Sequence, residues 1–318
     1  MAKVIVTGAS GFIGGQTALQ LHDSGHEVVG IDLVNPSKSL NSIFSHFINS
    51  DFAGNEALEW IYRSDAVAIV HCAGTSLVAP SIENPFDYYT NNFVRSKRMM
   101  DSIVQGKRQD IRVIFSSSAA VYGEPVMGAC QEEDPPLPIS PYGESKLMVE
   151  WLMQSYFRAY KLQPVMFRYF NACGADPQGR HGQPPMATHI IARVLESIKN
   201  KEDFTLYGTD YPTADGTCVR DYVHVEDIAR AHVLAVTQDI PTGVYNLGSS
   251  KGVSNQEIIA KAQEITGQQL SVTVGDARPG DPSVLTANSS RFDSIAGNWR
   301  QHSLEDIITH AWAWYNRQ

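Results

Sequence analysis

Residues 3–21 read KVIVTGASGFIGGQTALQL, and this stretch decides the fold class. A short apolar run is followed by three glycines, and apolar residues then recur at helical spacing, which predicts a strand, a tight loop and a helix. The glycines stand as Gly8-x-x-Gly11-x-x-Gly14, a variant of the dinucleotide-binding pattern. In that pattern glycine permits the turn and lets backbone approach a pyrophosphate, while the helix N-terminus supplies N–H groups for the phosphates.

A second predicted strand, HEVVGID at 26–32, ends in a carboxylate that suits the same ligand. Asp32 lies eighteen residues after Gly14. A carboxylate at this place accepts hydrogen bonds from both hydroxyls of an adenosine ribose and repels a 2'-phosphate. The pattern therefore favours NAD over NADP, and the simpler alternative is that Asp32 is an exposed carboxylate at a strand end.

The alternation of strand and helix continues through the first half of the chain. Continuous apolar segments predict strands at 66–74, 111–118 and 163–171, with a long helix from about 87 to 105. Strands buried on both faces and joined by helices indicate an α/β protein with a Rossmann-like, doubly wound parallel sheet. Ligands bind at the carboxyl ends of the strands in such sheets.

The segment SPYGESKLMVE, residues 140–150, places a tyrosine and a lysine one helical turn apart. A free tyrosine has a pKa near ~10, too high for a base at neutral pH unless its phenolate is stabilised. Lys146 can supply that positive charge, and Ser118, at the end of the preceding strand, can hold a substrate hydroxyl against Tyr142. Each residue alone would more often be an ordinary helix-face or strand-end group, but together they predict deprotonation of a hydroxyl whose carbon gives up hydride.

Composition excludes several other classes of protein. The net charge of −9 and the absence of a Lys/Arg-rich run argue against nucleic acid as a partner. No signal-like N-terminus and no apolar stretch of bilayer length is present, so we expect a cytoplasmic protein without a membrane. The four cysteines are widely spaced and the ten histidines show no ligand pattern, so we expect no disulfide and no metal, with His71 and His224 as core or supporting residues.

These features together resemble the extended short-chain dehydrogenase/reductase superfamily. The chain further resembles the UDP-glucose (UDP-galactose) 4-epimerases in the segments FSSSAAVYG, SPYGESKLMVE, RYFNACGADPQG, YGTDYPTADGTCVRDYVHVEDIARAH and VYNLGSS. The likeness extends over nearly the whole chain, and residues 207–227 carry its most specific part. By this resemblance, residues 1–171 form an NAD-binding Rossmann domain and residues 172–318 a smaller, discontinuous, mixed α/β domain for the UDP-sugar, with segments near 223–247 returning to the first domain.

The resemblance also implies a reaction in which NAD stays bound. Tyr142 would take the proton of the sugar 4-hydroxyl as hydride leaves C4, the 4-keto sugar would turn about its link to UDP, and hydride would return to the opposite face. Lys146 would contact the nicotinamide ribose and lower the pKa of Tyr142, while Ser118 would orient the 4-oxygen. The expected catalytic residues are thus Ser118, Tyr142 and Lys146, with a UDP-hexose as substrate and a homodimer as assembly.

Two sets of binding residues follow from the glycine loop and the resemblance. The cofactor is expected to contact Gly8, Gly11, Phe12, Ile13, Gly14, Asp32, Asp51, Phe52, Ala73, Gly74, Asn91, Ser116, Tyr142, Lys146 and Tyr169. The substrate is expected to contact Ser118, Tyr142, Phe170, Asn171, Leu206, Tyr207, Arg220, Arg278, Asp281 and Leu285. The two arginines would hold the pyrophosphate as paired guanidinium forks. The alternative for each arginine is a surface salt bridge with Asp221 or Asp281.

Some positions depart from the family pattern. Ser76 stands where a lysine toward the NAD phosphates is common, and NNFVRS at 91–96 replaces the usual small and polar residues. Leu33 replaces a frequent asparagine after the aspartate of the second strand. Leu285 stands where tyrosine excludes an N-acetyl group and a small residue admits it, so UDP-glucose and UDP-galactose are favoured and a UDP-N-acetylhexosamine 4-epimerase, or dual specificity, stays the alternative.

Three other functions share parts of this pattern. A nucleotide-sugar 4,6-dehydratase would need an acid and a base beside the strand-end serine, where this chain has Ala119 and Ala120. An ordinary NAD(P)-dependent reductase, which exchanges its cofactor in each turnover, would not need the segments that resemble UDP-binding ones. A non-catalytic nucleotide-sugar sensor would have no need of an intact Ser118, Tyr142 and Lys146.

Overall fold

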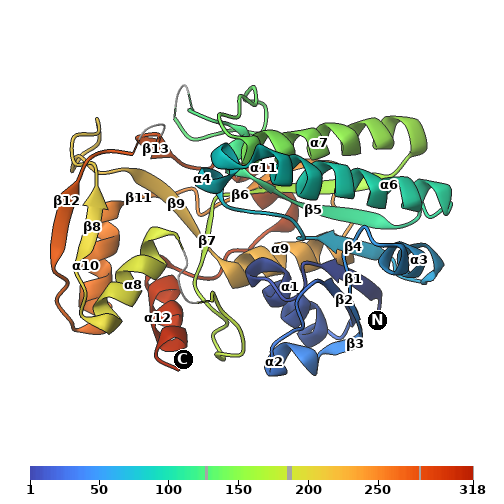
Figure 1. The fold of residues 1–318 in the computed structure, drawn as a ribbon, viewed down its shortest axis with the longest axis horizontal. Helices are drawn as coiled ribbons and strands as arrows, with labels where there is room; N and C mark the ends of the chain where they lie inside the picture. Colours follow the sequence, from blue (N-terminus) through green and yellow to red (C-terminus); the bar gives the residue numbers. More distant parts are fainter. Residues whose placement is uncertain (126–127, 185–187, 279–280, 318) are drawn as a thin grey trace.

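The computed structural model describes residues 1–125, 128–184, 188–278 and 281–317 and has the expected α/β architecture. Its main sheet is parallel throughout, with strand order β10-β6-β5-β4-β1-β2-β3 (Figure 1). In chain order the strands of this sheet are β1 (Lys3–Thr7), β2 (Glu27–Asp32), β3 (Phe44–Asn49), β4 (Ala68–His71), β5 (Arg112–Ser118), β6 (Gln163–Tyr169) and β10 (Gly243–Leu247).

Helices cover both faces of the main sheet, because its strands are apolar on both sides. One face packs against α1 (Phe12–Asp23) and α9 (Val225–Thr237), which also contact each other. The opposite face packs against α3 (Asn55–Arg63), α6 (Arg95–Gln105) and α7 (Pro141–Tyr160). The carboxyl ends of the strands stay uncovered by these layers and are therefore available for a ligand.

The helix expected from about 87 to 105 is divided into three. A short helix α5 (Pro85–Tyr88) leads into a π-helical turn η1 (Tyr89–Val94), after which α6 continues. A π turn carries an extra residue, which rotates the side chains that follow it around the helix axis. Here Asn92 is buried, where its side chain receives the Thr75 N–H and donates to Ser145, whereas Asn91 stays only partly buried.

A second group of smaller sheets follows the main one. Strand β9 (Val219–His224) pairs with β7 (Asn171–Cys173), β11 (Gly252–Ser254) and β13 (Val284–Leu285), and β8 (Phe204–Tyr207) pairs with β12 (Val272–Gly275). Helices α8 (Ile190–Asn200), α10 (Asn255–Thr266) and α12 (Leu304–Tyr315) share a third apolar core with β8. The strand expected at 163–171 is therefore two strands, since β6 continues the main sheet and β7 turns to pair with β9.

The remaining elements are short. They are α2 (Lys38–Asn41), α4 (Val78–Glu83), the 3-10 turn η2 (Ala119–Val121) and α11 (Ser290–Ala296). In the described part of the chain, no helix combines the length and apolar character needed to cross a membrane.

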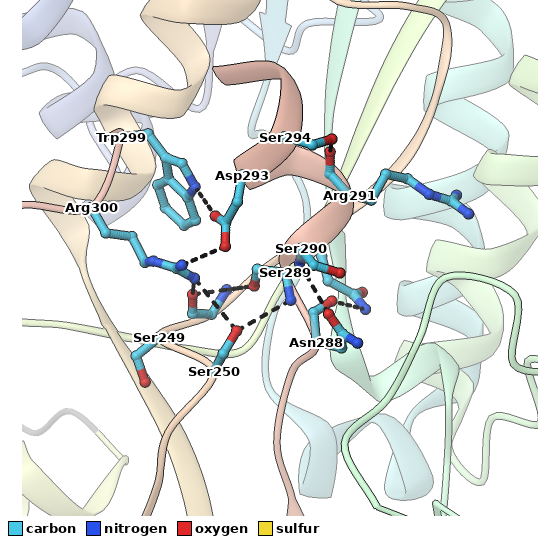
Figure 2. A network of polar contacts seen from close by, with 12 residues as sticks. Ser249, Ser250, Asn288, Ser289, Ser290, Arg291, Asp293, Ser294, Trp299 and Arg300 are labelled. Atoms are coloured by element: carbon cyan, nitrogen blue, oxygen red, sulfur yellow. Dashed lines mark hydrogen bonds and ion pairs between the residues drawn. The ribbon is translucent and has the colours of Figure 1, made fainter. Parts of the chain in front are cut away.

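A polar network ties the turn after β10 to the C-terminal segment (Figure 2). The Arg300 guanidinium donates to the Gly248 carbonyl at 2.8 Å and to the Asp293 carboxylate at 2.6 Å. Asp293 also accepts the Trp299 indole N–H at 2.7 Å, and Trp299 is itself buried. Since β10 belongs to the main sheet, this network fixes the C-terminal segment against it.

Candidate active site

The glycine loop takes the conformation that its sequence predicts. Gly8 has φ +70°, a left-handed backbone that favours glycine. A Cβ built on Gly14 would lie 2.1 Å from the Gly8 carbonyl oxygen, so only glycine lets α1 approach the end of β1 this closely. Helix α1 begins at Phe12, and no side chain among the described residues caps its N-terminus. Its first N–H groups are therefore open to an anion.

A cavity of about 560 Å³ opens in front of this loop, along the carboxyl ends of β1, β2 and β4. Of the expected cofactor residues, it is lined by Gly8, Gly11, Phe12, Ile13, Gly14, Asp32, Asp51, Phe52, Ala73, Gly74 and Asn91. Sequence reasoning did not assign to it Ser10, Ile31, Leu33, Val34, Ser50, Cys72, Thr75, Ser76, Arg95 and Gln183. The helical spacing of Asn91 and Arg95, four residues apart, was a signal that could have found the arginine.

Asp32 lies at the cavity wall with its carboxylate already oriented. One oxygen accepts the Ser10 N–H at 2.9 Å, and the other accepts the Val34 N–H at 3.0 Å. A carboxylate oxygen has a second lone pair, so both oxygens can still accept a ligand hydroxyl. The two backbone bonds hold the carboxylate in place for such a contact.

Tyr142 and Lys146 occupy the first turns of α7, which Ser140 caps and Pro141 begins. Both side chains are buried on the face of α7 that packs against β5, and Lys146 Nζ donates to the Ser116 carbonyl at 2.8 Å. That Nζ lies 5.9 Å from the centroid of the Tyr142 ring. A Cβ built on Gly74 would lie 3.9 Å from the same Nζ, so the wall of the cavity adjoins Lys146.

The pKa of Tyr142 moves in the direction opposite to the expected one. Burial raises the pKa of its phenol, and the Ser118 hydroxyl opposes that rise. Burial also lowers the pKa of Lys146 to about 8. In the protein chain on its own, removing the phenolate from water thus outweighs the Ser118 contact, and the lowering of the Tyr142 pKa by Lys146 beside bound NAD stays a prediction.

Three strand-end hydroxyls have different surroundings. Ser118 caps the turn η2 by accepting the Ala120 N–H at 3.2 Å. The Ser116 hydroxyl lies 3.0 Å from that of Tyr169, which donates to His232 Nε2 at 2.6 Å. Among the described residues, Ser116 and Tyr169 are outside the set that lines the cavity. The Ser116 carbonyl receives the Lys146 ammonium group, and the hydroxyl contact of Ser116 with Tyr169 helps to hold that residue in place.

A smaller recess of about 60 Å³ gathers residues expected at the nucleotide of the substrate. Leu206, Tyr207, Arg278 and Asp281 line it, and the Arg278 guanidinium carbon lies 4.3 Å from the centroid of the Tyr207 ring. Sequence reasoning missed the other residues of this wall, namely Thr188, Ile190, Arg193, Phe204, Thr205 and Asn255. They come from the segment that leads into α8, from α8 and β8, and from the start of α10, which no motif joins along the chain.

Arg220 is engaged within the protein. Its guanidinium forms an ion pair with Asp281, and Nη1 donates to the Val219 carbonyl at 2.9 Å. The neighbouring Asp221 is buried and accepts backbone N–H groups of the turn after β10, including that of Ser250 at 2.9 Å. The salt bridge to Asp281, one of the two alternatives for this arginine, is therefore present. Asp221 instead stabilises the turn after β10.

The other expected substrate residues lie around this strand. The Asn171 amide donates to the Asp221 carbonyl at 2.8 Å, so its side chain links β7 to β9. Leu285 pairs with Arg220 in the ladder between β13 and β9. Phe170 is buried in a small apolar cluster against which Leu285 packs. The structure thus places Leu285 beside both Arg220 and Phe170.

Three histidines come together although the sequence shows no ligand pattern. His224, His302 and His310 present nitrogen atoms within 4.8 Å of one another, at the junction of β9 and α12. His224 Nδ1 accepts the Glu226 N–H at 3.0 Å, which places the proton on Nε2, 3.0 Å from His310 Nδ1. A neutral ring with that proton has no lone pair left for a metal ion. The cluster is therefore a hydrogen-bonded link between two regions of the fold, which the spacing of the histidines along the chain did not indicate.

Comparison with known proteins identifies relatives over nearly the full length. The family described as "NAD dependent epimerase/dehydratase family" matches residues 4–248. A UDP-glucose 4-epimerase of Halalkalibacterium halodurans is 37% identical, covering 98% of this chain and 95% of that protein. The structure of a UDP-glucose 4-epimerase from Bifidobacterium longum in complex with NAD⁺ and UDP is similar with a TM-score of 0.91 and 29% identity, over 99% of this chain and 98% of the other.

A third relative widens the range of substrates among similar structures. The UDP-Glc/GlcNAc 4-epimerase of Campylobacter jejuni has a TM-score of 0.85 and 32% identity, with full coverage of both chains. Sequence and structure comparisons thus both extend over nearly the whole chain. The chain belongs to the NAD dependent epimerase/dehydratase family.

Proposed function

We propose that the protein interconverts UDP-galactose and UDP-glucose with NAD as a retained cofactor. The observation that carries this proposal is the junction at Gly74, where the wall of the glycine-loop cavity adjoins the ammonium group of Lys146. A dinucleotide whose phosphates lie at Gly11 and whose ribose hydroxyls lie at Asp32 extends toward that junction. The relatives named as UDP-glucose 4-epimerases support the same activity.

The cavity residues fit the cofactor on structural grounds. The cradle formed by Gly8, Gly11 and Gly14 excludes side chains, and the open helix N-terminus provides donors for a pyrophosphate. Asp32 keeps lone pairs for two ribose hydroxyls. When bound there, NAD supplies the acceptor for the C4 hydride and, in the return step, the donor.

Side chains of the protein transfer the proton of the sugar 4-hydroxyl. Tyr142 accepts the proton of the sugar 4-hydroxyl as C4 is oxidised and gives it back when C4 is reduced, so no net proton is consumed. Ser118, which already interacts with the Tyr142 phenol, orients the 4-oxygen. Because the pKa of Tyr142 is raised in the protein chain alone, the base becomes competent only when positive charge gathers beside it. Lys146, whose pKa of about 8 leaves it mostly protonated at neutral pH, contributes part of that charge.

The smaller recess accounts for the nucleotide of the substrate. We assign the uracil to the recess of Leu206 and Tyr207, and the diphosphate to Arg220 and Arg278. Leu285, partly buried beside Phe170, borders the sugar and leaves more room than tyrosine would. Since the Campylobacter relative is named for both UDP-Glc and GlcNAc, activity on UDP-N-acetylhexosamines is the second candidate.

The decisive experiment follows the sugar signals by proton NMR. Purified protein is incubated with UDP-galactose, with and without added NAD, and a parallel sample contains UDP-N-acetylgalactosamine. We expect UDP-glucose without added NAD, because a retained cofactor is restored in each turnover. Product only after NAD is added would indicate that the cofactor dissociates. The absence of product in all samples would contradict the proposal.

The arrangement of domains and subunits is part of the proposal. We infer an NAD-binding domain of residues 1–171 joined by α9 and β10, since β10 extends the main sheet beside β6. The rest of 172–318 then forms the substrate domain. We further propose a homodimer through α6 and α7, which run side by side along one edge of the molecule (Figure 1). This edge exposes the large apolar side chains of Val94, Trp151 and Phe157, which a second copy would cover.

We propose the cytoplasm as the location. The four cysteines are all free thiols in the structure. Free thiols persist most readily in a reducing compartment.

A further inference from the structure

One end of the cofactor cavity carries a positively charged side chain, Arg95, that belongs to none of the sequence motifs described above. Arg95 lines the cavity, and its Nε lies 3.1 Å from an Asp51 carboxylate oxygen. The other oxygen of Asp51 accepts the Ala53 N–H at 2.9 Å, so the carboxylate is anchored to the backbone. Because the Asp51 side chain is itself hydrogen-bonded to the backbone, its ion pair orients the Arg95 guanidinium in the cavity wall.

The helical segment through η1 brings Arg95 to this position. Arg95 is the first residue after the turn and lies four residues after Asn91, which lines the same cavity. Between them, Asn92 enters the core and bonds Thr75 and Ser145. Residues four apart lie on one face of a helix, so this segment presents both Asn91 and Arg95 to the cavity while Asn92, one position after Asn91, enters the core.

The part of a dinucleotide that reaches this end is its adenine base. The phosphates belong at the glycine loop and the adenosine ribose at Asp32, so the base lies beyond Asp32. There the wall consists of Leu33, Val34, Phe52 and the pair Arg95–Asp51. Leu33 and Val34 are 66% and 65% exposed, which leaves apolar surface that a flat ring would cover. A guanidinium is planar, weakly hydrated and stacks on aromatic faces.

We propose that Arg95, aligned by Asp51, packs on the adenine of NAD and is a positioning residue for the cofactor. This inference rests on the proposed function for the identity of the cofactor, and it adds a contact at the end of the cavity opposite the chemistry. It also gives a reason for cofactor retention in a chain that has Ser76, not lysine, near the phosphates. A role in binding a 2'-phosphate is disfavoured, because Asp51 neutralises Arg95 and Asp32 adds negative charge at the ribose.

Calorimetric titration of the nucleotide-free protein tests the proposal. The ligands are NAD, ADP-ribose, NADP and nicotinamide mononucleotide, which has no adenine. Arg95→Ala is compared with Arg98→Ala, a matched control whose side chain is on the same helix and bonds Asn55 outside the cavity. Arg95→Lys keeps the charge without the planar group. The pair Arg95→Ala with Asp51→Asn removes the carboxylate that a single variant would leave without its ion-pair partner.

We expect Arg95→Ala to weaken binding of NAD and ADP-ribose about 3- to 30-fold, in the range of a cation–aromatic contact. Arg95→Lys should lie between it and the wild type, and the double variant should bind NAD no more tightly than Arg95→Ala. Binding of nicotinamide mononucleotide and the melting temperature of the nucleotide-free protein should not change, which separates this role from a structural one. The Arg98→Ala control should bind all four ligands as the wild type does.

Several outcomes would overturn the proposal. Equal NAD affinity for Arg95→Ala and Arg98→Ala would exclude a contact with the base. A larger loss for NADP than for NAD would place the guanidinium at the 2'-position instead. Adenine-dependent weakening in a protein that shows no epimerisation would support the Arg95 contact and contradict the proposed function. A wild type that fails to bind NAD would overturn both.

Discussion

The cofactor end and the nucleotide-sugar end of the site are built in different ways. At the cofactor end, Gly11, Asp32, Phe52 and Gly74 follow successive strands of one parallel sheet, so their backbone places them at one edge. At the sugar-nucleotide end, the residues come from separate small sheets and helices. The first end depends on local geometry that recurs along the chain, whereas the second depends on how distant segments pack.

The two ends also differ in how their charges are satisfied without a ligand. Asp32 is held by two backbone N–H groups and can still accept two further hydrogen bonds. Arg220 instead shares an ion pair with Asp281, a residue expected to bind the substrate as well. A diphosphate must therefore compete with Asp281 for Arg220. A ribose, in contrast, finds an Asp32 carboxylate that can accept hydrogen bonds from its hydroxyls without losing a partner. We expect the cofactor end to be preorganised and the sugar-nucleotide end to rearrange on binding.

The largest effect is expected at the junction between the two ends. Tyr142→Phe removes the hydroxyl that exchanges the proton but keeps the ring packed against Tyr88. Turnover of UDP-galactose should fall about 10²- to 10⁴-fold, the range for a general acid–base. Calorimetric affinities for NAD and UDP should stay within about twofold of the wild type. Turnover close to that of the wild type would remove Tyr142 from the chemistry.

A smaller effect, confined to the sugar-nucleotide end, would sharpen the comparison. Arg220→Ala should weaken UDP binding about 10- to 100-fold, as for loss of a charged hydrogen bond, without changing NAD binding. Asp281→Asn distinguishes the two roles of this carboxylate, as the ion-pair partner of Arg220 and as a direct contact of the nucleotide. Tighter UDP binding would mean that competition for Arg220 dominates, and weaker binding would mean that a direct contact with the nucleotide dominates. Equal loss of NAD and UDP binding in Arg220→Ala would show that the two ends are not independent.

The smallest effect for any single residue concerns stability against pH. Burial lowers the pKa of His71 to about 3 and that of His232 to about 4, and it lowers that of His224, in the other region, to about 2. Above the unfolded pKa of about 6.5 these histidines are neutral in both states, so their full contribution to stability is present. Below about pH 6.5 these histidines bind protons in the unfolded chain but stay neutral in the folded chain. Each histidine then lowers the free energy of unfolding by roughly 1.4 kcal/mol per pH unit.

Thermal unfolding between pH 7 and pH 5 measures this dependence, and the melting temperature should fall as the pH falls. His302 has the opposite sign: burial lowers its pKa, but Glu226 and Asp227 outweigh burial and raise it. Its contribution is complete below pH 6.5 and is lost as the pH rises through the folded pKa. His302→Gln should therefore make the decline toward pH 5 steeper, and a shallower decline would contradict this assignment.

Much of the cofactor end could be predicted because its signals are local. A strand, three glycines and a helix occupy consecutive residues, and Asp32 follows at the end of the next strand. The split of the helix at 87–105 could not be predicted, because the π turn depends on Asn92 finding Thr75 and Ser145 in the core. The rise of the Tyr142 pKa in the protein chain alone could not be predicted either, since spacing reveals the nearby lysine but not the loss of water around the phenol.

By itself, the sequence determined the doubly wound sheet, the glycine cradle and the pairing of Tyr142 with Lys146. The cradle and the pair each follow from backbone freedom or side-chain periodicity within one short segment, and the sheet follows from the repetition of strand and helix patterns along the chain. Only the tertiary structure decided that Arg95 pairs with Asp51 in the cavity wall, that Arg220 pairs with Asp281 and that three histidines meet between β9 and α12. The physical reason is that burial and pairing of charges depend on which distant segments exclude water from one another, and no local pattern encodes that choice.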